Sequence, residues 1–159
     1  MSTAERTLAR VRAATGADAA AVAGAVTELL VELGATPPAH AAMESTARAL
    51  IAQPYAGAVV VADSDGTLVG VLSASWQTAI HIPGRYALIQ DLWVHRSWRS
   101  DGIGAALLAA LFERARAAQI ARVEVGLPRE SFAALDATES FYRRNGFTPL
   151  GPRMRMVLR

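Results

Sequence analysis

The sequence predicts an α/β fold with a mixed central sheet of about six or seven strands flanked by helices. The first observation behind this prediction is the order of the expected elements, β-α-α-β-β-β-α-β-α-β, along 159 residues. The second is that hairpin-forming strands precede a strand–helix–strand unit, which favours a mixed sheet over a doubly wound parallel one. Hydrophobic residues make up 52% of the chain, which suits one packed core, so we expect residues 1–159 to form a single domain.

The N-terminal third is expected to contain one strand and two helices. Residues 8–14 have the apolar pattern of a short strand. The Ala-rich stretch 18–33 carries its larger apolar residues at helical spacing, and Gly34 is suited to end that helix. A second helix over 39–52 follows a Pro-Pro pair and is closed by Pro54.

The centre of the chain is dense in strand-forming residues. The runs 56–63 and 67–76 flank a short turn containing Asp65 and Gly66, and an Asp-Gly pair between apolar runs is a strong hairpin signal. A third run, 86–95, follows a Pro-Gly turn. These segments predict three consecutive strands.

The C-terminal half alternates between helix and strand patterns. The stretch 102–119 has one apolar helical stripe and predicts a long helix. A strand is expected over 121–127, a short helix over 136–146, and a final strand over 153–158.

Composition excludes several kinds of chemistry. The chain has no Cys, so it has no disulfide, no thiolate zinc site and no cysteine nucleophile. All 16 basic residues are Arg, which excludes a Schiff-base lysine and suits an anionic ligand. The arginines are scattered and the net charge is only +2, so no nucleic-acid partner is expected. The three His residues lack ligand spacing, so no metal is expected.

No stretch has the pattern of a signal peptide or membrane span, which predicts a cytoplasmic protein with no membrane partner.

The sharpest chemical signal is the glycine-containing loop before the long helix. Arg99, Gly102 and Gly104 lie between a strand and that helix. Free backbone N–H groups at a helix N-terminus bind phosphates, and glycine lets a phosphate approach closely. An ordinary glycine turn is the alternative. A P-loop would need a Lys, and a dinucleotide fingerprint would need glycine at Leu107, so both are excluded.

Three motifs together resemble the GNAT superfamily of acyl-CoA N-acyltransferases. The segment RSDGIG (99–104) matches the family pattern [RQ]-x-x-G-x-[GA] between a strand and a helix. LIQDLWV (88–94) is similar to the family's fourth strand, and FYRRNGF (141–147) to its closing FYxxxGF motif. The motifs occur in the family's order, and the resemblance covers about residues 59–147.

The resemblance implies acetyl-CoA as co-substrate and assigns it a binding site. Main-chain groups of Leu92, Trp93 and Val94 would pair with pantetheine like an added strand, and Arg99 would lie beside the pyrophosphate. The backbone N–H groups that would hold the pyrophosphate belong to Ser100, Asp101, Gly102, Ile103, Gly104 and Ala105.

Two side chains are candidate catalytic residues. Tyr142 matches the family tyrosine that often protonates the departing CoA thiolate; its alternative role is packing of the last helix. Asp91 would bind the amine or act as a base through water, or it would satisfy backbone donors at a β-bulge. Glu124 is a further candidate for this role, but we favour its placement on a solvated strand face. Gln90 stands where the family often has Glu, and an amide cannot act as a base.

The function implied by the resemblance is transfer of an acetyl group to a primary amine of a small molecule or peptide by direct attack. The alternative is an acyl-CoA-binding sensor or a catalytically inactive homologue. Gln90 favours this alternative, as does Leu135, which stands where the family often has an Asn that contacts the cofactor. The family is often dimeric, which makes a homodimer one candidate assembly, but the sequence leaves the oligomeric state open. The identity of the amine, and whether the acyl group is always acetyl, are left open by the sequence.

Overall fold

The computed structural model describes residues 8–159, and one mixed sheet of five strands, in the order β1-β2-β3-β4-β5, forms its centre. The strands are β1 (Arg10–Ala13), β2 (Gly57–Ser64), β3 (Thr67–Ala79), β4 (Gly84–Val94) and β5 (Val123–Val125). Strands β1 to β4 pair antiparallel with their neighbours, whereas β5 runs parallel to β4. The mixed α/β architecture is confirmed, with five strands instead of the expected six or seven.

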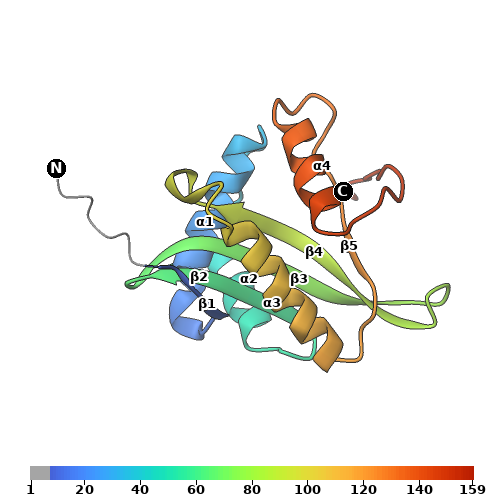
Figure 1. Ribbon diagram of the computed structural model, residues 1–159, viewed down its shortest axis with the longest axis horizontal. Coiled ribbons are helices and arrows are strands. Elements are labelled where there is room, and N and C mark those ends of the chain that lie inside the picture. Colours follow the sequence, from blue (N-terminus) through green and yellow to red (C-terminus); the bar gives the residue numbers. More distant parts are fainter. Residues whose placement is uncertain (1–7) are drawn as a thin grey trace.

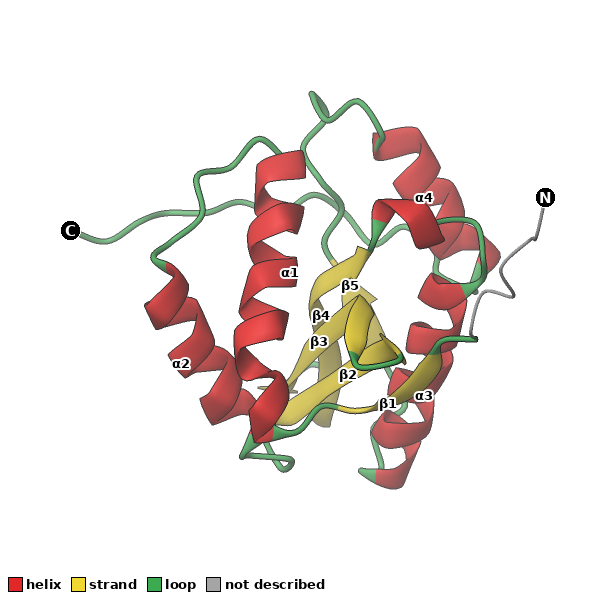
Figure 2. Cartoon of the chain, turned by 90° about the vertical axis from the view of Figure 1, so that its left-hand side faces the viewer, coloured by secondary structure: helices red, strands yellow, loops and turns green. Residues whose placement is uncertain are grey.

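Helices cover both faces of this sheet (Figure 1, Figure 2). Helices α1 (Ala19–Glu32) and α2 (His40–Ile51) lie side by side on one face, and α3 (Ile103–Ala117) crosses the other. Helix α4 (Leu135–Arg144) lies beside the start of α3. All four helices coincide with stretches for which the sequence predicts a helix, to within about three residues at each end.

The core consists of two layers because β2 is buried on both faces. Successive residues of a strand point to opposite faces. Val60 therefore packs with Leu107 beneath α3, whereas Val59 and Val61 pack with Val22 beneath α1. The run of valines in this strand reflects burial on both sides.

The β2–β3 hairpin forms at the predicted turn. Asp65 and Gly66 both have positive φ, 49° and 84°, as a two-residue turn between twisted strands requires. The side chain of Asp63 accepts a hydrogen bond from the Gly66 N–H at 2.7 Å. This local signal was sufficient to place the pairing of β2 with β3.

The strand predicted over 153–158 is wrong. These residues have no regular secondary structure, and the segment runs away from the sheet (Figure 2). Four of its apolar side chains are exposed: Met154, Met156, Val157 and Leu158. An alternating pattern predicts a strand only where a neighbouring strand accepts its hydrogen bonds, and this segment pairs with none of the described strands.

Among residues 8–159, no helix is long and apolar enough to cross a membrane.

Candidate functional site

A β-bulge in the middle of β4 shapes the site. Asp91 pairs with Ser73, but Ile89 pairs with the next residue, Ala74, so Gln90 is an extra residue in β4. Such an insertion brings two successive side chains to the same face. Accordingly, the Ser73 hydroxyl donates to Asp91 at 2.5 Å, and the Gln90 amide donates to the Ser75 hydroxyl at 3.1 Å.

Beyond this bulge, β4 has an edge that β5 does not cover. Strand β5 pairs only with Ala87, Leu88 and Ile89, so it leaves β4 just before the bulge. The uncovered edge, from Gln90 to Val94, includes the residues predicted to pair with pantetheine. Main-chain groups along an uncovered strand edge can bind an extended ligand as an additional strand.

The side chains of the predicted pantetheine-binding residues do not take part in this edge. Leu92 packs into the core beneath α3, and Trp93 is buried in the layer beneath α1. The ring of Trp93 also meets His95 edge-on, with centroids 5.9 Å apart. Main-chain groups of successive strand residues face opposite edges, and the His95 N–H donates to the Val69 carbonyl of β3, so Trp93 also faces β3. Leu92 and Val94 therefore present their main-chain groups to the open edge, where the Val94 carbonyl accepts from Arg99.

The glycine loop turns sharply into α3. Ser100 and Gly102 both have positive φ, 68° and 81°. Nothing lies within 4 Å of where a Gly102 Cβ would be, so the backbone conformation and not the space requires this glycine. The first intrahelical bond runs from Ala106 N–H to Gly102 carbonyl, so the N–H groups of the three residues between them have no intrahelical acceptor. Together with the helix dipole, these donors suit an anion.

Arg99 is tied to two parts of the protein. Its Nε donates to the Val94 carbonyl at 3.0 Å, and its Nη2 lies 2.7 and 2.8 Å from the two carboxylate oxygens of Glu32. Glu32 is the last residue of α1, so Arg99 connects the glycine loop to that helix. Contact between Arg99 and a pyrophosphate stays a prediction.

Gly104 has a packing role that the sequence did not reveal. A Cβ at this position would come within 3.0 Å of two ring carbons of Phe141. Phe141 belongs to the FYRRNGF motif, so the second glycine of the loop allows α4 to approach α3 closely. The two motifs are thus linked by a direct contact.

Tyr142 is a core residue, only 7% exposed. Its ring packs edge-on against Phe141 and Phe147, each at a centroid distance of 5.2 Å. Burial raises the pKa of the Tyr142 hydroxyl to about 12, so it is protonated at neutral pH. The packing role is therefore present, and a contact between its hydroxyl and the CoA thiolate stays a prediction.

Asp91 faces a cavity of about 330 Å³ between α1, α2 and the sheet. Ser73 and Asp91 are at its sheet side, and apolar residues of the two helices form most of the remaining wall. Burial raises the pKa of Asp91 above its usual value, and the hydrogen bond from Ser73 partly opposes this shift. The only hint of this cavity in the sequence was the high Ala content of the two helices, whose small side chains leave space.

The structure places the two candidate catalytic residues on opposite faces of the sheet. Asp91 faces the cavity beneath α1 and α2, whereas Tyr142 belongs to the core beneath α3.

Glu124 forms an ion pair with Arg122, and the Arg122 Nε lies 2.8 Å from the Glu124 carboxylate. This pair agrees with a structural role for Glu124 on the strand face. Within the described residues, no group of three or more His, Asp or Glu side chains could hold a metal ion.

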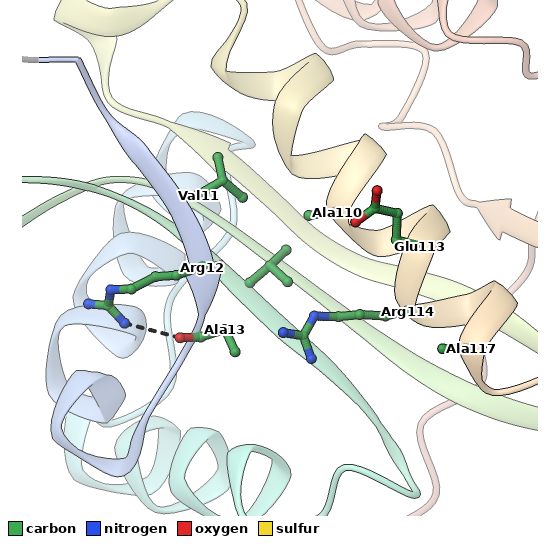
Figure 3. A pocket seen from close by; sticks show the side chains of 8 residues that line it. Val11, Arg12, Ala13, Ala110, Glu113, Arg114 and Ala117 are labelled. Atoms are coloured by element: carbon green, nitrogen blue, oxygen red, sulfur yellow. Dashed lines mark hydrogen bonds between the residues drawn. The ribbon is translucent and has the colours of Figure 1, made fainter.

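A second cavity, of about 300 Å³, lies between β1 and α3 and contains none of the predicted site residues (Figure 3). Its charged lining residues include Arg12, Glu113 and Arg114. Figure 3 shows the guanidinium of Arg12 turned away from α3, and this group pairs instead with Asp18 and Asp63, at 2.8 and 3.0 Å. Arg12 thereby lowers the pKa of Asp18 to about 2, a structural role.

Comparison with known proteins agrees with this geometry. Among solved structures, the chain is similar to a possible acetyltransferase from Clostridium difficile 630, with a TM-score of 0.78, 16% identity, and coverage of 95% of this chain and 98% of that one. It is also similar to a predicted acetyltransferase from Clostridium acetobutylicum solved with acetyl-CoA, with a TM-score of 0.77, 14% identity, and coverage of 94% and 96%. At these identities the likeness shows the fold alone.

The chain thus has the mixed α/β fold of these structures, with an open β4 edge beside a glycine loop. The model of the acetyltransferase (GNAT) domain matches residues 56–149, so the chain belongs to the GNAT acetyltransferase family. No curated protein sequence matches the chain.

Proposed function

We propose that the protein transfers an acetyl group from acetyl-CoA to a primary amine by direct attack. The observation that carries this proposal is the departure of β5 from β4 after Ile89, which leaves the edge from Gln90 to Val94 uncovered. The start of α3, whose N–H groups suit an anion, follows this edge within the next ten residues. An extended thioester with a pyrophosphate at one end fits such an arrangement, because its extended part would lie along an open strand edge and its pyrophosphate at a helix N-terminus.

The reaction needs a neutral amine, alignment of the reactants and stabilisation of the oxyanion. The amine nitrogen forms a bond to the thioester carbon, the C–S bond breaks, and the surplus amine proton passes to water or to Asp91. A main-chain N–H near Leu92 or Trp93 would donate to the developing oxyanion. Positioning supplies much of the rate, so Gln90, which cannot take a proton, is compatible with turnover.

Tyr142 would assist the departing thiolate by donating a hydrogen bond. A thiol of ordinary pKa, about 8.5, is a stronger acid than this buried tyrosine, whose pKa is about 12. Complete proton transfer from Tyr142 to the thiolate would therefore be uphill by about 5 kcal/mol. A charge-assisted hydrogen bond disperses the charge on sulfur without that cost.

A sensor that binds acyl-CoA without turnover is the second candidate. It is favoured by Gln90, whose amide is held by the Ser75 hydroxyl and offers no base. Release of CoA thiol from acetyl-CoA, measured across a panel of amines, separates the two functions. Calorimetric binding of CoA without thiol release on any amine would support the sensor, and absence of CoA binding would overturn both. A cytoplasmic location and a homodimer stay predictions.

A further inference from the structure

The geometry points to a small primary monoamine with an apolar body as the acceptor, bound in the cavity between α1, α2 and the sheet. This inference rests on the proposed function, because it names the acceptor class for that site. Asp91 connects this cavity with the expected acetyl-CoA site, because it faces the cavity and belongs to the uncovered stretch of β4. An amine held at Asp91 would therefore lie where β4 is expected to present the thioester.

Charge complementarity selects a cation at the sheet side of the cavity. Among the described residues that line it, Asp91 is the only charged one, and none of the others is Arg or His. The Ser73 hydroxyl donates to one carboxylate oxygen of Asp91 and leaves acceptor capacity for an ammonium N–H. A ligand carboxylate would be repelled at the same place, which disfavours amino acids.

The rest of the wall offers no partner for a second charge. It is built by apolar residues of both helices and β2, including Val22, Met43, Leu50 and Val59. Within residues 8–159, the one further polar residue in the lining is Thr46, and its hydroxyl already donates to the Ala42 carbonyl at 3.0 Å. An ammonium or a sugar hydroxyl placed against the buried part of this wall, at Val22 and Val59, would lose water without gaining a hydrogen bond. Diamines and aminoglycosides are therefore disfavoured.

The size of the cavity limits the body of the amine. A volume of about 330 Å³ lies at the lower end of the range for ligand pockets. It corresponds to the space of about ten water molecules at ~30 Å³ each. An alkyl or aryl group of roughly six to eight carbons matches this space, whereas a polypeptide chain does not. Ala23, Ala42 and Ala47 provide the room by presenting single methyl groups.

The test compares n-hexylamine with 1,6-diaminohexane, which has the same chain length and a second ammonium. Calorimetry on the full chain saturated with CoA, near neutral pH, measures both affinities. We expect n-hexylamine to bind at least tenfold more tightly, and n-butylamine to bind about three- to fourfold more weakly for each methylene it lacks. Equal or tighter binding of the diamine would overturn the inference.

Two pairs of variants locate the binding. Asp91→Asn should weaken n-hexylamine at least tenfold, whereas Asp65→Asn removes the same charge from the β2–β3 turn and should change nothing. Ala42→Phe should reduce n-hexylamine affinity severalfold by filling the cavity mouth. Ala49→Phe, on the same helix but outside the cavity lining, should not, because both alanines are exposed and the helix tolerates either change alike. Unchanged affinity in Asp91→Asn would overturn the inference.

The proposed function and this inference are tested by different measurements, so the failure of one can be told from the failure of the other. CoA binding is measured first, without amine, and its absence would overturn the proposed function. If CoA binds but the diamine or an amino acid is the tighter ligand, the proposed function stands and only the acceptor class is wrong.

Discussion

Gly104 lies directly against the ring of Phe141, so close that a Cβ would approach two ring carbons to 3.0 Å. This contact joins the start of α3 to α4, and therefore joins two motifs that are far apart in the sequence. The glycine loop thus has two separable requirements. Gly102 permits a left-handed backbone, whereas Gly104 permits close packing of two helices.

Gly104→Val should destabilise the protein by about 1–3 kcal/mol, the usual effect of overpacking. When Phe141→Leu is combined with Gly104→Val, it should relieve most of this loss, because the smaller side chain makes room for the valine. A double-mutant cycle measured by urea unfolding gives the coupling between the two positions. Additive losses would mean that the two residues do not contact each other.

Gly102→Ala tests the backbone requirement alone. A non-glycine residue at a φ of +81° costs about 1–2 kcal/mol, and a methyl group meets nothing within 4 Å. The expected loss of stability should therefore be insensitive to the residue at position 141. If Phe141→Leu also relieved the loss in Gly102→Ala, the assignment of separate roles would be wrong.

Arg99→Ala should weaken CoA binding by about 1–3 kcal/mol if its guanidinium reaches a phosphate. Glu32→Gln is the matched variant, because it removes the observed ion-pair partner and leaves the guanidinium in place. We expect Glu32→Gln to leave CoA affinity unchanged or improved, as measured by calorimetry. Equal weakening by both variants would show that Arg99 acts only by fastening the loop to α1.

Asp91 should make stability fall as pH rises above about 4. Because burial raises its pKa, the folded protein holds this proton more tightly than the unfolded chain does. Asp91→Asn removes the buried charge and keeps an acceptor for Ser73. At pH 7 it should melt above the wild type by ~2–4 °C for each kcal/mol gained. Below about pH 3.5, where Asp91 is protonated in both states, the difference should vanish. A variant that melts at or below the wild-type temperature at pH 7 would contradict this.

Tyr142→Phe should lower kcat about 10- to 100-fold, the effect of one charge-assisted hydrogen bond, while CoA affinity stays nearly constant. The melting temperature should change little, because the buried ring remains. Tyr55→Phe removes the same atom from an exposed tyrosine and serves as the control. Wild-type turnover in Tyr142→Phe would leave this residue with a packing role only.

The sequence alone determined the local elements and the motif order. Helical spacing of apolar residues predicted α1 and α3, and the Asp65-Gly66 pair predicted the β2–β3 hairpin. These signals could be read because they depend on residues within one or two turns of each other. The three GNAT motifs also located the glycine loop, the strand before it and Tyr142, since each motif is a short continuous segment.

Only the tertiary structure decided how these parts meet. The pairing of β5 with three residues of β4, which leaves the edge beyond the bulge uncovered, depends on a strand more than 30 residues away in the sequence. The same holds for the placement of Asp91 and Tyr142 on opposite faces, and for the absence of a strand over 153–158. The cavity at Asp91 arises from the packing of two helices against the sheet. Side-chain periodicity indicates which face of an element is apolar, but not which element covers that face or what space is left between them.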